Sequence, residues 1–275
     1  MLGKLIKNDF KASAHTMLGI YAVAFAAFVA SGIAFMGDNT EPTPLQLILA
    51  VLLIFISFAI LIVPVFQLIS YFNKSLYSNQ GYLSYTLPVK GSSLLLSKGI
   101  VSFSWILLSF VQFAAVYVLI YAGLMNRVSP EVREVLNQLY QAMNGPEKDA
   151  LIKSLLVLLA VALFEIIFLI AQIFFTITLS NVKPFNSFGN LGGIILFIVV
   201  FLISNSIFMK LTTTFPLTLC VNFDRVYLAK FPMTEIATEG IFFTIGLGGA
   251  IFQAAAAVLM FIATEYLMSK KVNIK

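Results

Sequence analysis

Polar side chains inside long apolar stretches are the residues of this chain whose types and positions point most directly to chemistry. Glu165 stands between phenylalanine and isoleucine residues. A charged carboxylate at the centre of a membrane-spanning helix costs at least ~2.5 kcal/mol, so we expect Glu165 to face other helices or a wet cavity. Five amides occupy similar apolar surroundings: Gln67, Gln112, Gln172, Asn205 and Gln253. Together with Glu165, they are candidates for the polar lining of a pathway.

Two interpretations of Glu165 follow from these surroundings. It is either a protonated, structural group that hydrogen-bonds Gln172, Gln112 or a serine, or a charged group that contacts a cationic substrate or carries a proton. The structural interpretation is favoured, because a single carboxyl has no second titrating group to which it could relay a proton. Each amide has a similar ordinary alternative, which is a hydrogen bond between two helices.

Metal and nucleotide chemistry are not expected on this chain. The sequence has one histidine, His15, and one cysteine, Cys220, so it contains neither a zinc-binding HExxH pair nor a cysteine cluster. No GxxxxGK[ST] phosphate-binding loop occurs, and the nearest segment, Gly91 to Lys98, lacks the second glycine. We therefore predict no catalytic residue, no metal site and no cofactor on this chain, and we do not expect an enzyme.

Composition defines the class of protein. The chain has 275 residues, of which 60% are hydrophobic and 11% charged. Soluble domains have about 25% charged residues. In a membrane protein, a net charge of +5 reports topology and contact with lipid head groups rather than binding of nucleic acid. The sequence predicts an all-α, polytopic membrane protein with a single transmembrane domain over residues 1–275.

Six apolar stretches are long enough to cross a membrane as helices. They are residues 15–36, 45–71, 100–124, 151–179, 191–209 and 241–268. The apolar character continues beyond the fifth stretch, where threonines and Pro216 interrupt it, and this indicates a re-entrant or interfacial segment at 211–223. Gly246, Gly248 and Gly249 would let other helices approach closely.

A surface helix is predicted at 129–144, between the third and fourth stretches. Ser129 and Pro130 have the residue types of an N-cap and a first helical position. Its apolar residues form one stripe, which we expect to pack on protein or at the outer interface: Val132, Val135, Leu136, Leu139 and Met143.

Residues 1–13 have the pattern of an amphipathic helix that lies in the membrane interface. One face carries Leu2, Leu5, Ile6 and Phe10, and the opposite face carries Lys4, Lys7 and Lys11. Asp9 falls on the apolar face and breaks the pattern. It is either solvated on a frayed helix or faces a protein partner, and the solvated interpretation is favoured.

Charge counting predicts the orientation in the membrane. With the N-terminus inside and six spans, the inner segments hold ten lysines and Asp9 alone. The outer segments hold seven basic and nine acidic residues, while Glu165 and Glu265 fall within spans. An excess of basic residues on the cytoplasmic side is the general rule, so we expect both termini to be cytoplasmic.

Residues 73–99 join the second and third spans and are too polar to cross a membrane. Their charged residues are all lysines, while their middle is rich in leucine and tyrosine. Such a segment is typical of a cytoplasmic surface element that contacts another protein. An ordinary interfacial loop helix fits the composition equally well.

This segment and the six-span organisation resemble the permease subunits of ABC-2-type exporters. The resemblance rests on Gly81-Tyr82-Leu83, Thr86-Leu87-Pro88-Val89 and Ser97-Lys98, together with the basic N-terminal helix. It implies that 73–99 is a coupling segment that docks into a separate ATP-binding subunit. The coupling residues would be Gly81, Tyr82, Leu83, Thr86, Leu87, Pro88 and Lys98. Leu5, Asp9 and Phe10 would belong to a connecting helix beside it.

The resemblance also implies a function, which is ATP-driven export across the bacterial plasma membrane. The pathway would form between this chain and a second copy or a homologous permease, while ATP and Mg²⁺ would bind to the partner subunit. Drugs, peptides, bacteriocins, polysaccharides and lipids all stay open as substrates. Two other classes also stay open: the membrane subunit of an ATPase-dependent importer, and a non-transport membrane protein such as an immunity or assembly factor.

Overall fold

The computed structural model describes residues 2–35, 43–78, 81, 89–124, 134, 137, 148–222, 226–235 and 241–270. Its long helices are α1 (Leu2–Phe35), α2 (Pro44–Tyr77), α4 (Gly91–Leu124), α6 (Lys148–Ser180), α7 (Gly189–Thr214) and α8 (Leu247–Lys270). Each contains a stretch long and apolar enough to cross a membrane, with a mean hydropathy between 1.6 and 2.9. The predicted all-α, polytopic membrane fold with six candidate spans is confirmed.

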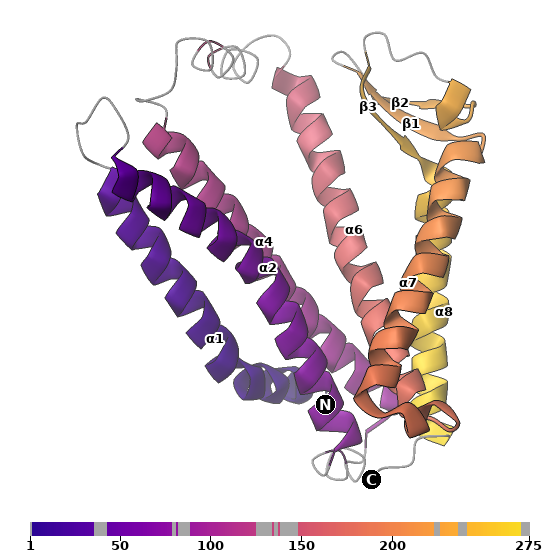
Figure 1. Cartoon of the computed structure of the whole chain (residues 1–275). Helices are drawn as coiled ribbons and strands as arrows, with labels where there is room; N and C mark the ends of the chain where they lie inside the picture. Colours follow the sequence, from indigo (N-terminus) through magenta and orange to yellow (C-terminus); the bar gives the residue numbers. More distant parts are fainter. Residues whose placement is uncertain are drawn as a thin grey trace. The chain divides into compact units, whose positions relative to one another are not determined.

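The chain divides into two compact units, Met1–Asn137 and Gln138–Lys275, where the sequence suggested a single domain. In the first unit, α1, α2 and α4 pack against one another (Figure 1). Buried residues from all three helices form its core, among them Met17, Leu53, Phe72 and Val101. Both α1 and α4 are longer than the predicted spans, because their polar first turns continue the same helices.

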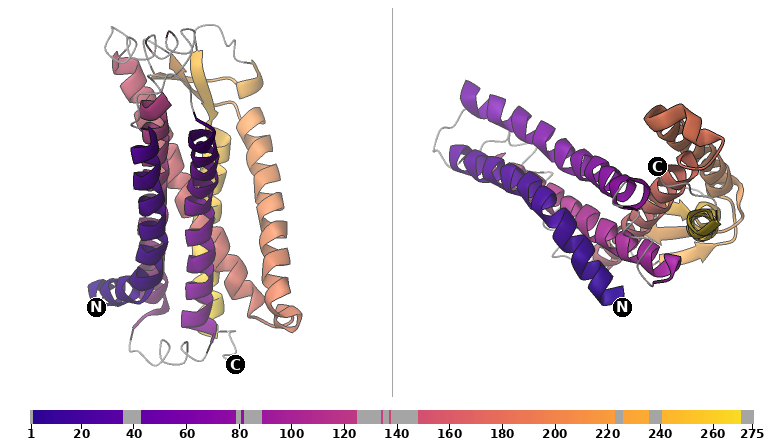
Figure 2. Two further views of the ribbon diagram at one scale, coloured as in Figure 1. Left: turned by 60° about the vertical axis from the view of Figure 1, so that its left-hand side comes forward. Right: turned by 90° about the horizontal axis from the view of Figure 1, so that it is seen from below.

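Helix α1 bends near its start, so that its first turns run at a steep angle to the rest of the helix (Figure 2). In these turns, Lys4, Lys7 and Lys11 are exposed, whereas Leu5 and Phe10 are partly buried. This distribution agrees with the amphipathic pattern of residues 1–13. The amphipathic segment and the first span are therefore one continuous helix.

In the second unit, α6, α7 and α8 pack against one another. Phe168 and Ala171 of α6 and Ala257 of α8 form a buried apolar cluster. A 3₁₀ turn at Phe185–Phe188 joins α6 to α7. Helices α6 and α8 thus meet along small and aromatic side chains, and small residues are common where membrane helices pack closely.

A small antiparallel sheet lies at the end of the second unit where α7 finishes and α8 begins (Figure 1). Its strands are β1 (Thr218–Asn222), β2 (Val226–Ala229) and β3 (Ile241–Gly246), in the order β2–β1–β3. The sequence predicted a re-entrant or interfacial segment at 211–223, which is part helix and part strand, and a helix from 241, where residues 241–246 instead form β3. α7 continues to Thr214, and α8 starts at Leu247. Short apolar runs rich in β-branched and aromatic residues fit a strand as well as a helix, which explains the error.

Glycines allow the start of α8 to approach the end of α7 closely. A Cβ atom on Gly248 would collide with the Leu211 carbonyl and the Phe215 side chain. A Cβ atom on Gly249 would collide with the side chains of Thr212 and Phe208. These positions therefore need glycine for the packing of α7 on α8, as the sequence predicted.

Candidate functional site

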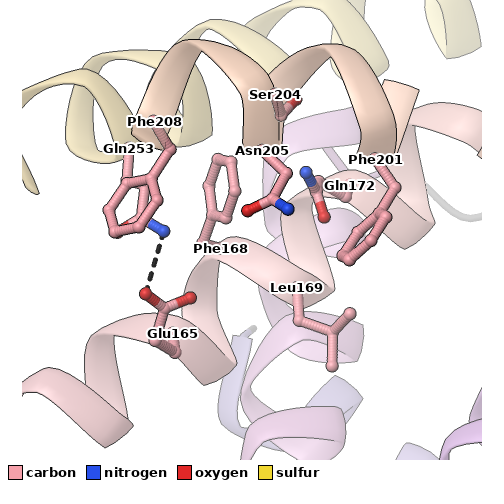
Figure 3. Close-up of a pocket in the computed structure, with 9 residues that line it drawn as sticks. All are labelled: Glu165, Phe168, Leu169, Gln172, Phe201, Ser204, Asn205, Phe208 and Gln253. Carbon is pink, nitrogen blue, oxygen red and sulfur yellow. Dashed lines mark hydrogen bonds between the residues drawn. The ribbon is translucent and has the colours of Figure 1, made fainter. Parts of the chain in front are cut away.

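Four of the six predicted polar candidates line one cleft in the second unit, formed by α6, α7 and α8 (Figure 3). These residues are Glu165, Gln172, Asn205 and Gln253. The α6 wall consists of Glu165, Phe168, Leu169 and Gln172, and the α7 wall consists of Phe201, Ser204, Asn205 and Phe208. Both sets have the spacing i, i+3, i+4, i+7, so each forms a stripe on one helical face. The cleft has a volume of about 200 Å³.

Glu165 marks one end of the cleft, near the middle of the candidate span Ile152–Ser180. The Gln253 side chain on α8 donates a hydrogen bond from Nε2 to Glu165 Oε1 at a distance of 2.9 Å. Gln253 is only 5% exposed, whereas Glu165 is exposed to the cleft. The carboxylate is therefore held by an amide from another helix, while part of it stays accessible to a ligand.

Gln172 marks the other end of the cleft. Its side chain is 2% exposed, and its Nε2 has no hydrogen-bond partner among the described residues. A buried polar donor without an acceptor costs about 1–3 kcal/mol. The Nε2–H group of Gln172 is therefore available to donate a hydrogen bond to an oxygen atom of a ligand in the cleft.

The remaining lining is apolar with two small polar groups. Three phenylalanines and Leu169 supply most of the walls, and Ser204 and Asn205 lie between the two ends. No lysine, arginine or histidine is among the nine described lining residues, so Glu165 faces no cation there. The cleft thus has a carboxyl group at one end, an amide donor at the other end and an aromatic body between them.

The other two candidates lie in the first unit, Gln67 on α2 and Gln112 on α4. Gln112 Nε2 donates to the backbone carbonyl of Tyr21 at 3.2 Å, which ties α4 to α1. Gln112 therefore makes the ordinary hydrogen bond between helices that the sequence left open for it.

A second polar cluster joins the N-terminal helix to the start of α4 in the first unit. Asp9 Oδ1 lies 3.2 Å from Lys98 Nζ and accepts a hydrogen bond from the Tyr71 hydroxyl at 2.7 Å. The Ser97 hydroxyl donates to Asp9 Oδ2 at 2.6 Å. Lys98 Nζ also lies 4.9 Å from the centre of the Tyr71 ring, as in a cation–π contact.

This cluster corrects the favoured interpretation of Asp9, which was a solvated group on a frayed helix. The Asp9 side chain is 14% exposed and the Lys98 side chain 3% exposed, so the ion pair is largely buried. The pair forms across the fold and leaves no local signal in the sequence. The available clue was that Asp9 interrupts an apolar face and therefore needs a partner from another helix.

The rest of the seam between α1 and α4 is aromatic and hydrogen-bonded. The Phe10 and Trp105 rings lie 5.7 Å apart, and Trp105 Nε1 donates to Ser13 Oγ at 3.0 Å. The Tyr21 hydroxyl donates to the Trp105 carbonyl at 2.8 Å. Three residues of α1, spaced along the helix, therefore contact Trp105 of α4, and the Trp105 side chain is buried against protein.

Most of the predicted coupling residues lie outside the described residues, namely Tyr82, Leu83, Thr86, Leu87 and Pro88, and the same holds for the apolar stripe of the predicted helix 129–144. Gly81 is described and buried, and its N–H donates to the Ser78 carbonyl at 2.7 Å. A Cβ atom on Gly81 would collide with the Leu76 backbone, so the close turn after α2 requires glycine. Lys98 is the other described member of the set.

Comparison of the chain with protein-family models, with curated proteins and with solved structures finds no match. The class of the protein is therefore inferred from its fold and its cleft alone. It is a multi-pass membrane protein in which a polar cleft opens among the spans of the second unit.

Proposed function

We propose that the chain is the membrane-spanning permease subunit of an ATP-driven ABC exporter in the bacterial plasma membrane. It forms a substrate pathway with a second copy or a homologous permease, and a separate subunit binds ATP and Mg²⁺. The six spans, the sequence resemblance at 81–98 and the polar cleft support this proposal. The chain itself performs no covalent chemistry in this account.

The Asp9–Lys98 cluster is the observation that carries the proposal. Residues 79–90 form the link between α2 and α4, and the cluster lies just after this link. Tyr71 near the end of α2, Asp9 on α1 and Lys98 on α4 all meet there. A displacement of the link by a docked protein would therefore move all three helices together, because a buried ion pair with hydrogen bonds resists separation.

Such a connection provides the physical basis for coupling. An ATP-binding subunit that closes on ATP would pull on the link between α2 and α4. The spans would then move between arrangements that open the pathway to either side, and nucleotide binding would shift the populations of these arrangements. ATP hydrolysis supplies the energy, and differential binding of the ATPase to the two arrangements couples it to the movement of the spans.

Reconstitution tests the proposal. Proteoliposomes with the chain and an ATP-binding subunit should hydrolyse ATP and move substrate, while Leu83→Asp should uncouple hydrolysis from transport, because a charge would disrupt an apolar docking contact. Leu83→Met is the matched control, since it preserves apolar character and volume. Normal transport by Leu83→Asp would argue against the coupling segment.

A further inference from the structure

The two ends of the cleft in the second unit have a defined separation. Glu165 and Gln172 are both on α6, seven residues apart, which corresponds to two turns or about 10 Å along the helix. Phe168 and Leu169 lie between them on the same face. Any ligand that reaches both polar ends must therefore span about two helical turns across an apolar surface.

The Glu165 end is suited to a cation with several hydrogen-bond donors. Oε1 already accepts from Gln253, and Oε2 has no hydrogen bond among the described residues. No basic side chain among the nine lining residues competes for the carboxylate. A protonated amine would neutralise the charge, and the rings of Phe168 and Phe208, which line the same end (Figure 3), could contact it through their faces.

The Gln172 end is suited to a hydrogen-bond acceptor. Gln172 Nε2 is buried and unpartnered, so an oxygen atom of a ligand would relieve the cost of its desolvation. An apolar molecule without an oxygen atom would leave this donor unsatisfied. The two ends thus select different groups on one ligand.

We propose that this cleft binds a protonated amine on an apolar body that also carries a hydrogen-bond acceptor about two helical turns, or ~10 Å, from the nitrogen. Glu165 pairs with the ammonium group, and Gln172 donates to the acceptor. The assignment of this ligand as the exported substrate rests on the proposed function. Binding itself requires no ATPase, so it can be measured on the permease chain alone.

This chemistry has two natural sources. One is a free amphiphilic amine, and the other is the ethanolamine head group of a membrane lipid. Both present an ammonium group, a more distant oxygen acceptor (in the lipid, an ester oxygen) and an apolar part. They are distinguished by the composition of the membrane in which binding is measured.

The test uses the full chain in phosphatidylcholine nanodiscs, because choline has no primary amine. The probe is N-dansyl-1,5-diaminopentane, which carries an ammonium group, an apolar body and sulfonyl oxygens. Its N-acetylated analogue has the same shape without the charge. Fluorescence titration should show that the wild-type chain binds the amine roughly tenfold or more tightly than the acetylated probe.

Substitutions at the two ends of the cleft test which residue binds the ammonium group and which binds the acceptor. Glu165→Gln should weaken amine binding by roughly tenfold or more and leave the weak binding of the acetylated probe unchanged. Gln172→Leu should weaken binding of both probes by several-fold, because each carries the sulfonyl acceptor. Glu265→Gln is the matched control, since Glu265 is also a carboxylate within a candidate span and does not line the cleft. Binding by Glu265→Gln should equal that of the wild type.

Three results would overturn the proposal. They are equal binding of both probes by the wild type, unchanged amine binding by Glu165→Gln, and an equal loss in Glu265→Gln. If Glu165→Gln does not fold, the comparison of the two probes on the wild type still decides whether the charge matters. Displacement of the probe by phosphatidylethanolamine in the nanodisc would support the ammonium site with a lipid as occupant. Failed ATP-driven transport with intact probe binding would count against the proposed function alone.

Discussion

The ammonium nitrogen of Lys98 lies 3.2 Å from Asp9 Oδ1, although 89 residues separate the two in the sequence. Both side chains are removed from most solvent, and Ser97 and Tyr71 fill the remaining positions around the carboxylate. A buried ion pair of this kind is stabilising only while it is complete.

Removal of Asp9 should destabilise the first unit strongly. Asp9→Ala leaves the Lys98 ammonium buried without its counter-ion, and we expect a loss of about 3 kcal/mol. The double variant Asp9→Ala/Lys98→Met should recover much of this loss, because no uncompensated charge is left. Thermal unfolding in detergent measures both. A double variant as unstable as Asp9→Ala would contradict the ion-pair account.

Substitution of Gly249 should disrupt the contact between α7 and α8. Gly249→Val places a branched side chain against Thr212 and Phe208, and overpacking of this kind costs about 1–3 kcal/mol. Gly19→Ala is the control, because open space surrounds the position of its Cβ and alanine favours a helix. Thermal unfolding should separate the two variants, and equal stability would show that the close approach is not needed.

Intrinsic fluorescence should report the burial of Trp105, which is the one tryptophan of the chain. Its side chain is 7% exposed and packs against Phe10 and Tyr21. Acrylamide should therefore quench the folded protein weakly and the denatured protein strongly. Strong quenching of the folded protein would place the indole in water at the membrane surface instead.

Cysteine labelling should report the orientation of the chain. On a background with Cys220→Ala, an impermeant maleimide should label Lys148→Cys in intact cells but label Lys90→Cys only after the membrane is opened. Both lysines are exposed, so differences in reactivity report the side of the membrane. Labelling of Lys90→Cys in intact cells would reverse the predicted topology.

The sequence predicted the six helices and singled out the polar residues that line the cleft, but it did not predict that they meet in the second unit. A polar group in the middle of an apolar helix must face protein or water, so Glu165, Gln172, Asn205 and Gln253 were expected to point inward from their helices. The seven-residue spacing of Glu165 and Gln172 is compatible with one face of α6. Which residues of α7 and α8 lie opposite them follows only from the packing of the helices.

Three other features could not be predicted from the sequence. The pairing of Asp9 with Lys98 depends on which faces of α1 and α4 meet, and no local pattern encodes this choice. The strands at 218–246 are apolar runs of four to six residues, which are too short for their period to distinguish a strand from a helix. The unsatisfied Nε2 of Gln172 is a property of packing alone.

Purification of the tagged chain from its native membranes tests the proposed function most directly. The account predicts that an ABC-type ATP-binding subunit co-purifies with the wild-type chain in near-stoichiometric amount, as measured by quantitative mass spectrometry. It also predicts that Leu83→Asp loses this subunit, whereas Leu83→Met retains it. Purification of the folded wild-type chain without any ATP-binding subunit would contradict the proposal that this protein is an ATP-driven permease.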